Sequence, residues 1–414
     1  MKKKIIGIFV CTLVLATALP AVGTLNNSLK GESLVDKPLD GGWTKTFGGS
    51  DWDFGDCVQQ TSDGGYIITA DTKSYGAGGL DIWLIKTDAD GVEEWNKTFG
   101  GSALDWPDFI LQTIDGGFII SGETYSYGAG GSDAWLIKTD TDGNKIWDKT
   151  YGGTGFERAR TVWNTTDGGY IIGGSTSSFG AGDSDYWLIK TDSNGIEQWN
   201  KTFGGTGPDD CWAMRPVDGG YILVGFVLPT KIFDKAYCWL VKTDADGNKL
   251  WDKKIEGTRW SAGWDIRQTS DGGYIISGET NGFGFWAGSL QFNFGGDMWL
   301  VKTDADGNKI WDKSFGRRIL EDSGMCVELT DDGGYIIGGN TKGFGNMLSP
   351  IPPLPFSKIW VVKTDADGNK IWDKEFSRGI CWSIRQTSDG GHIVTGGGTK
   401  KLLGQSDVFF IKID

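Results

Sequence analysis

The fifteen residues WLVKTDADGNKIWDK (299–313) recur along the chain with small changes. Close copies are WLIKTDADGVEEWNK (83–97), WLIKTDTDGNKIWDK (135–149) and WLVKTDADGNKLWDK (239–253). Each copy is typical of two short strands, rich in branched and aromatic residues, that are joined by an Asp- and Gly-rich tight turn. The sequence therefore indicates one β unit written many times, and the period of that unit decides the fold.

A second marker, Asp-Gly-Gly followed by Tyr, Phe or His, gives the period. Its aspartates are Asp63, Asp115, Asp167, Asp218, Asp271, Asp332 and Asp389, at spacings of 51 to 61 residues. Each unit contains four strand-like runs, and no sustained helical period interrupts them. Four-stranded units of about 50 residues are typical of propeller blades. We predict an all-β fold, a seven-bladed β-propeller of four-stranded antiparallel blades.

The two ends of the chain predict how the ring closes. The chain stops at DVFFIKID (407–414), which matches a third strand, so the seventh unit lacks its fourth. The run DGGWTKTFGG (40–49) matches a fourth strand, with Trp43 at the position of Trp95. We predict that the N-terminal strand completes the last blade, and that residues 43–414 form the propeller.

Residues 1–23 have the pattern of a secretory signal peptide: three lysines, an apolar run, and small residues at its end. Residues 24–42 are then a linker, and the alternative is an uncleaved N-terminal anchor. Without residues 1–23 the net charge changes from −14 to −17, because three lysines and no acids are lost. Such a charge disfavours nucleic acid and anionic membranes. We expect a secreted or cell-surface protein with no nucleic-acid partner and no membrane insertion beyond the signal segment.

Many of the 21 tryptophans fit a structural role. One set begins the third strands, where large rings fill the space between blades, and a second set opens the fourth strands and docks on the neighbouring blade. The single histidine, His392, argues against zinc sites and histidine catalysis. The cysteines form no CxxC pair, so we expect no disulfide framework.

The spacing Gly-x-x-x-Trp, as in Gly91 to Trp95 and Gly307 to Trp311, resembles the tryptophan-docking repeat of quinoprotein-type propellers. The resemblance covers residues 43–414 and implies the fold. Those enzymes usually have eight blades and often a pair of adjacent cysteines, whereas this chain has seven units and no such pair, so no cofactor is carried over. More broadly, the chain is similar to secreted or cell-surface propeller-repeat proteins, whose roles are diverse.

Loops between blades, and between second and third strands, vary most from unit to unit and hold aromatic and charged residues. Rings of this kind stack on sugar faces, while polar groups bind hydroxyls. The candidate ligand-binding residues are Trp52, Asp53, Asp105, Trp106, Asp209, Trp212, Arg259, Trp260, Trp264, Trp286, Arg378 and Trp382. The alternative is that they close the channel mouth and pack the loops.

We expect a non-enzymatic, exported binding or adhesion module that engages a glycan or an extracellular protein through this variable face. One alternative is a carbohydrate-active enzyme, a glycoside hydrolase or lyase, with Asp53 and Asp105 as its paired carboxylates. Another is a structural protein of the cell envelope. We expect no cofactor and no catalytic metal. Calcium at the TDADGN turn, through Asp304 and Asp306, competes with a plain hairpin turn at the same residues.

Overall fold

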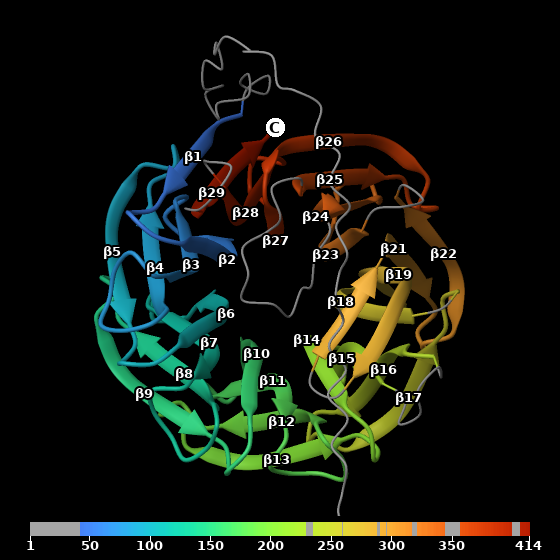
Figure 1. The fold of residues 1–414 in the computed structure, drawn as a ribbon, viewed down its shortest axis with the longest axis horizontal. Coiled ribbons are helices and arrows are strands. Elements are labelled where there is room, and N and C mark those ends of the chain that lie inside the picture. Colours follow the sequence, from blue (N-terminus) through green and yellow to red (C-terminus); the bar gives the residue numbers. More distant parts are fainter. Residues whose placement is uncertain are drawn as a thin grey trace, which may run out of the picture. The chain divides into compact units, whose positions relative to one another are not determined.

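The computed structural model describes residues 42–228, 235–258, 260–287, 290–294, 296–316, 321–343, 357–399 and 406–414. These residues form 29 strands and no helix, in seven separate antiparallel sheets. Figure 1 shows the sheets arranged in a ring, each one a blade that runs from the centre to the rim. The predicted seven-bladed β-propeller is confirmed.

The blades follow the chain in order, with their strands numbered from the centre outwards. Blade one comprises β2 (Asp53–Gln60), β3 (Tyr66–Thr72), β4 (Asp81–Thr87) and β5 (Glu93–Phe99). Blade two comprises β6 (Asp105–Gln112), β7 (Phe118–Thr124), β8 (Asp133–Thr139) and β9 (Lys145–Tyr151). Blade three comprises β10 (Glu157–Asn164), β11 (Tyr170–Thr176), β12 (Asp185–Thr191) and β13 (Glu197–Phe203). Blade four comprises β14 (Asp209–Val217), β15 (Gly220–Val227), β16 (Tyr237–Asp244) and β17 (Lys249–Ile255).

The last three blades carry the irregularities. Blade five comprises β18 (Trp260–Gln268), β19 (Tyr274–Ala287), β21 (Asp297–Thr303) and β22 (Lys309–Phe315), with β20 (Leu290–Phe294) added to β19. Blade six comprises β23 (Glu321–Leu329), β24 (Tyr335–Gly343), β25 (Lys358–Thr364) and β26 (Lys370–Arg378). Blade seven comprises β27 (Ile380–Gln386), β28 (His392–Thr399), β29 (Ser406–Ile413) and the first strand of the chain, β1 (Thr44–Phe47).

The ring closes by pairing the two ends of the chain. Strand β1 pairs antiparallel with β29, with Thr44 opposite Ile411. The ring of Trp43 packs against Phe410 with centroids 4.8 Å apart. The predicted completion of the last blade by the N-terminal strand is therefore confirmed.

The two sets of tryptophans have the roles that the repeat predicts. In the third strands, Trp135 is 1% exposed and its indole N–H donates to Asp148 at 3.1 Å. At the fourth strands, six of the seven rings lie on a glycine of the following blade. A Cβ built on Gly91 would be 2.5 Å from the ring of Trp43, and one on Gly143 would be 2.5 Å from Trp95. Adjacent blades are thus held by an indole seated on a bare backbone.

The Asp-rich turns use their own carboxylates. In the turn between β21 and β22, Asp304 Oδ1 accepts hydrogen bonds from the backbone N–H of Asp306 and Asn308, at 3.1 and 2.7 Å. Its Oδ2 accepts from the Asn308 side chain at 2.9 Å, and Gly307 has a φ of +77°. Both carboxylate oxygens of Asp304 therefore serve the hairpin turn.

The long segment after the second strand of blade five differs from the expected loop. Strand β19 continues past its blade and pairs with β20 as a hairpin, with Phe283 opposite Phe294 and Phe285 opposite Phe292. The residues FGFWAGSLQFNF place aromatic residues at alternate positions, which is the period of a strand. That alternation was the signal for a hairpin, and the expectation of a loop was wrong.

Candidate functional site

The innermost strand of every blade lines the centre of the propeller, as Figure 1 shows for β2, β6, β10, β14, β18, β23 and β27. Each of these strands has a β-bulge at the same place, where its pairing with the second strand skips one residue. A bulge leaves one residue unpaired and redirects its side chain. The skipped residues, which we call the bulge ring, are Asp56, Asp108, Arg160, Trp212, Trp264, Met325 and Trp382.

The bulge ring is divided into a polar arc on blades one to three and an apolar arc on blades four to seven. On the apolar arc, Trp212 and Trp264 meet edge to face with centroids 4.5 Å apart. Their neighbours Trp382 and Met325 belong to the same hydrophobic cluster. The arcs meet where the Arg160 guanidinium lies 3.6 Å from the Trp212 ring centroid, a stacked cation–π contact.

The polar arc continues into an ionic network between blades two, three and four. Arg158 donates two hydrogen bonds of 2.8 Å to Asp108, and Arg160 donates one of 3.1 Å to the same carboxylate. Weaker ion pairs join Arg158 to Glu123 at 3.7 Å and Arg160 to Asp210 at 3.8 Å. The two guanidinium groups are thus shared among three carboxylates, Asp108, Glu123 and Asp210.

Two further carboxyl groups of blade one, Asp56 and Asp71, lie at the edge of this network. Burial, Asp71 and Asp108 raise the pKa of Asp56 well above its usual range. Burial and the charge of Asp53 raise the pKa of Asp71 to about 7. Asp56 Oδ2 and Asp71 Oδ1 are buried and have no hydrogen-bond partner in the described part of the chain. The network therefore holds more carboxyl groups than guanidinium groups, and two of its buried carboxyl oxygens have no partner among the described residues.

We expect Asp71→Asn to stabilise the protein at pH 8 by about 2 kcal/mol, and to change its stability little at about pH 3.5. The folded-state pKa of Asp71 lies above its unfolded value, so its carboxyl costs nothing below the unfolded pKa. The cost grows as the pH rises from the unfolded pKa towards 7, because the carboxyl ionises in the unfolded chain while the folded protein still holds its proton, and it levels off above pH 7. Urea unfolding at both pH values measures the difference. The exposed turn residue Asp90 gives the matched control, and a stabilisation by Asp71→Asn that is equal at both pH values would contradict the assignment.

A second ionic cluster lies on the same inner strands, nearer to the Asp-Gly-Gly hairpins. Asp265 accepts hydrogen bonds from Arg215 at 2.9 Å and from Arg267 at 2.7 Å. Arg267 also donates two hydrogen bonds of 2.9 Å to Glu328, which lies 3.7 Å from Arg385. These arginines hold the pKa of Asp265 well below its usual range despite burial. The cluster ties blades four, five, six and seven together around the centre.

The structure brings together part of the predicted set of ligand-binding residues. Trp212, Trp264 and Trp382 are members of the bulge ring, and Trp260 packs against Trp264 with centroids 6.0 Å apart. Trp52 and Trp106 lie elsewhere, at the start of blades one and two. There Lys73 is 5.3 Å from the Trp52 ring, and Tyr125 meets the Trp106 ring at 5.6 Å.

The predicted carboxylates Asp53, Asp105 and Asp209 begin their innermost strands and are 0%, 0% and 2% exposed. Asp53 accepts hydrogen bonds from the Gly49 backbone N–H at 2.8 Å, from Ser74 Oγ at 2.7 Å and from the Thr72 hydroxyl. Asp105 repeats this pattern in blade two with Gly101, Ser126 and Thr124. These carboxylates fix the loop that enters each blade.

Three predicted residues are not described at the side-chain level. Arg259 lies outside the described residues, and so do the side chains of Trp286 and Arg378.

Sequence reasoning missed the acidic and basic members of the bulge ring, although the repeat contained a signal for them. The ring residue lies seven positions before the marker aspartate, as in Asp56 before Asp63 and Arg160 before Asp167. In blade four, where the hairpin is one residue shorter, Trp212 lies six positions before Asp218. Comparing this one column between units shows a position that is acidic, basic, aromatic or a methionine from blade to blade.

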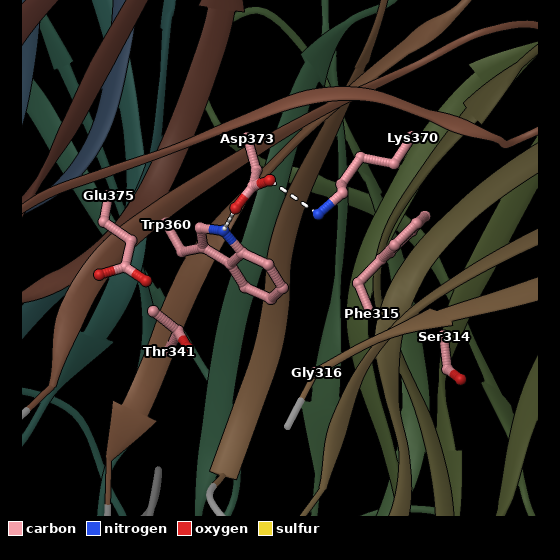
Figure 2. A pocket seen from close by; sticks show the side chains of 8 residues that line it. All are labelled: Ser314, Phe315, Gly316, Thr341, Trp360, Lys370, Asp373 and Glu375. Atoms are coloured by element: carbon pink, nitrogen blue, oxygen red, sulfur yellow. Dashed lines mark hydrogen bonds and ion pairs between the residues drawn. The ribbon is translucent and has the colours of Figure 1, made fainter. Parts of the chain in front are cut away.

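A separate pocket of about 290 Å³ lies on the outer side of blades five and six (Figure 2). Asp373 accepts hydrogen bonds there from the Trp360 indole at 3.0 Å and from Lys370 at 2.7 Å. Trp299 and Asp312 make the same indole–carboxylate pair in blade five, so this lining belongs to the framework of the repeat. The pocket therefore carries no argument for function.

Support for the fold comes from the comparison with solved structures, and the comparisons of sequence find no relative. No protein-family model matches the sequence, and a search of curated proteins finds no match. None of the described residues forms a helix long and apolar enough to cross a membrane.

Among solved structures, the WD40 β-propeller domain of Doa1 is similar, with a TM-score of 0.51, 12% identity, and coverage of 88% of this chain and 95% of that one. The Dos1 propeller gives a TM-score of 0.48, 11% identity, and coverage of 89% and 94%. Sqt1 from Chaetomium thermophilum gives 0.46, 11%, and coverage of 89% and 100%. At these identities the likeness shows the β-propeller fold alone, and function must be argued from the residues of this chain.

Proposed function

We propose that the protein is a non-enzymatic binding module that takes a glycan on the bulge ring. The observation that carries the proposal is the division of the ring into an indole arc and a carboxyl–guanidinium arc around one axis. A pyranose has an apolar face that packs on an indole and a rim of hydroxyls that needs polar partners. Both kinds of partner are present in the bulge ring at the same level of the propeller.

The unpartnered atoms of the ring favour a hydroxyl-rich ligand. Buried donors without a partner in the described chain include the indole N–H groups of Trp212 and Trp264 and Nε of Arg160, and buried oxygens without one include Asp56 Oδ2. A sugar hydroxyl both donates and accepts, so one kind of group serves all of these atoms. An apolar peptide side chain would leave them unsatisfied at a cost of about 1–3 kcal/mol each.

The wider setting of this function is part of the same proposal. An exported, cell-surface or secreted location is supported by the lysines and the apolar run of residues 1–23. The likeness to tryptophan-docking propellers is supported by the indoles that sit on glycines between blades. The alternative is an extracellular protein bound through the segments between the second and third strands of blades four to six, which lie largely outside the described residues. The following test distinguishes that outcome.

The test is a titration of intrinsic tryptophan fluorescence with a panel of neutral, acidic and amino oligosaccharides, and with unrelated peptides. We expect a saturable change with at least one oligosaccharide, and dissociation at least tenfold weaker in Trp382→Ala. Trp372→Ala is the matched control, since Trp372 is also half-buried but lies in the outer strand of blade six. A flat response to every sugar, an equal loss in both variants, or a response to peptides alone would overturn the glycan proposal.

A further inference from the structure

Five of the seven blade junctions, all within the described residues, hold two carboxylates beside one glycine. One carboxylate begins a third strand, and the other begins the innermost strand of the following blade. The pairs are Asp407 with Asp53, Asp81 with Asp105, Asp133 with Glu157, Asp185 with Asp209, and Asp297 with Asp322. These pairs lie between blades and are separate from the bulge ring.

The glycine allows the two carboxylates to approach each other. A Cβ built on Gly204 would lie 1.8 Å from Asp185 Oδ1 and 2.8 Å from Asp209 Oδ2, so these oxygens are at most 4.6 Å apart. The same construction on Gly100 gives 1.7 Å to Asp81 and 3.0 Å to Asp105, which places those oxygens within 4.7 Å. Any side chain on the glycine would overlap the first carboxylate.

The junction of blades three and four leaves oxygens of both carboxylates without a hydrogen bond. Asp185 Oδ2 accepts from the backbone N–H of Ala181 and Gly182, and Asp209 Oδ2 accepts from Gly205. The Oδ1 atoms of both residues are buried with no partner in the described chain, although the side chains are only 1% and 2% exposed. Burial and then the charge of Asp185 raise the pKa of Asp209 to about 6, although the Gly205 N–H and the charge of Lys254 act in the opposite direction.

The reason for the unpartnered Asp209 oxygen lies in one substitution within the repeat. In blades one and two the first carboxylate of the blade accepts a hydrogen bond from Thr72 or Thr124 at the end of the second strand. In blade four the residue opposite Asp209 is Val227, which has no hydroxyl. The carboxylate is kept where its hydrogen-bond donor is lost, which indicates that it has another partner.

At the two remaining junctions, both carboxylates of the pair are replaced by other residues. Between blades four and five, the equivalent positions are Tyr237 and Ser261, and the glycine position is Glu256. Between blades six and seven they are Lys358 and Gly379, and the glycine position is Ser377. No junction in the described chain keeps one carboxylate alone, so the pair and its glycine behave as one unit.

We propose that these carboxylate pairs bind calcium ions at the blade junctions, with the junction of Asp185 and Asp209 as the strongest case. Ca²⁺ takes oxygen ligands at about 2.3–2.6 Å, so one ion can contact two oxygens that lie within 4.7 Å of each other. The described residues contain no group of three or more acidic, His or Cys side chains suited to a metal. The remaining ligands of each ion would therefore be main-chain carbonyls, hydroxyls and water. Mg²⁺ demands stricter octahedral geometry and Zn²⁺ favours nitrogen and sulfur, so both suit the pair less well.

The test uses the full-length protein, stripped with EDTA and then supplied with calcium, magnesium or terbium. We expect calcium to raise the midpoint of thermal unfolding by several degrees and magnesium to have a smaller effect. Terbium luminescence excited through tryptophan should appear on addition and fall when calcium displaces it. Equilibrium dialysis should count up to about five calcium ions per chain at saturation, as the number of junction pairs predicts.

A double variant tests whether the junction of blades three and four contributes one calcium ion to the number bound per chain. Asp185→Tyr with Asp209→Ser reproduces the residues that the junction of blades four and five already has, and it should bind one ion fewer. Asp304→Asn with Asp306→Asn, in the exposed turn, is the control and should leave the count unchanged. The proposal is overturned by an absence of both thermal shift and terbium emission, or by an unchanged count in the double variant. A stabilisation that follows falling pH and ignores calcium would also overturn it, because the pair would then share a proton.

Discussion

Replacing Asp265 with alanine is expected to lower the free energy of unfolding by about 3–5 kcal/mol. Asp265 is 6% exposed and receives hydrogen bonds from two buried arginines, Arg215 and Arg267, together with the backbone N–H of Ile266 at 2.9 Å. Without the carboxylate, Arg215, Arg267 and Arg385 share Glu328, so positive charge remains uncompensated in the interior. The loss is large because a charge is left buried without its partner, which costs more than the intact pair contributes.

Urea unfolding followed by circular dichroism at pH 7 measures the loss. Asp265→Asn separates charge from shape and should fall between the wild type and Asp265→Ala. Asp246→Ala removes an exposed turn carboxylate and should change the free energy by less than about 0.5 kcal/mol. If Asp265→Ala behaves like Asp246→Ala, the central cluster does not hold the blades together.

Gly91→Ala is expected to destabilise the ring by about 3 kcal/mol, whereas Gly64→Ala costs about 1 kcal/mol. Both glycines have a positive φ, +70° and +86°, so both alanines suffer the same backbone strain. Only at Gly91 does the new methyl group meet an obstacle, the ring of Trp43 at 2.5 Å, while nothing lies within 4 Å at Gly64. The difference between the two variants therefore measures the seating of Trp43 at the closure of the ring.

Thermal and urea unfolding of the two variants, in the same buffer, give this difference. Equal destabilisation would show that the indole moves aside at little cost and that docking on the glycine contributes little. Near-ultraviolet circular dichroism supplies a second readout, since only Gly91→Ala should change the environment of an indole.

The fold was predictable because similar hairpin contacts, and with them a similar sequence, recur from unit to unit. The marker aspartates explain this: Asp271 accepts hydrogen bonds from the Thr269 hydroxyl and the Gly273 N–H, and it pairs with the buried Lys302 at 2.8 Å. Six of the seven units have this Thr–Asp hydrogen bond and the same letters, whereas in blade four Lys242 donates to the main-chain oxygen of Asp218. Closure was predictable for a similar reason, because Trp43 stands in a position that six other tryptophans also occupy.

The candidate site was predictable only in part. Asp53 and Asp56 are three residues apart in one strand, yet Asp53 fixes a loop and Asp56 belongs to the bulge ring. Which of these two roles a residue has depends on the position of the β-bulge. A bulge arises from the pairing of two strands, so the alternation of residues along one strand does not reveal it. Indoles such as Trp212 stood out by their type, whereas Arg160 looked like an ordinary strand residue until its stacking on Trp212 was seen.

The pairing of β1 with β29 can form only after all seven blades have been synthesised, because it joins the first strand to the last. Thr44 leaves the ribosome 367 residues before Ile411, its partner in the sheet. Blades one to six each have all four strands as soon as their own segment is synthesised, so they can assemble in sequence from the first to the sixth. The first strand must wait through all of this with an open edge, and its joining is the strand pairing of longest range among the described residues. A truncated product that lacks only its last few residues would therefore be an almost complete circle with two exposed edges, and such a species is the one most prone to pair with its neighbours.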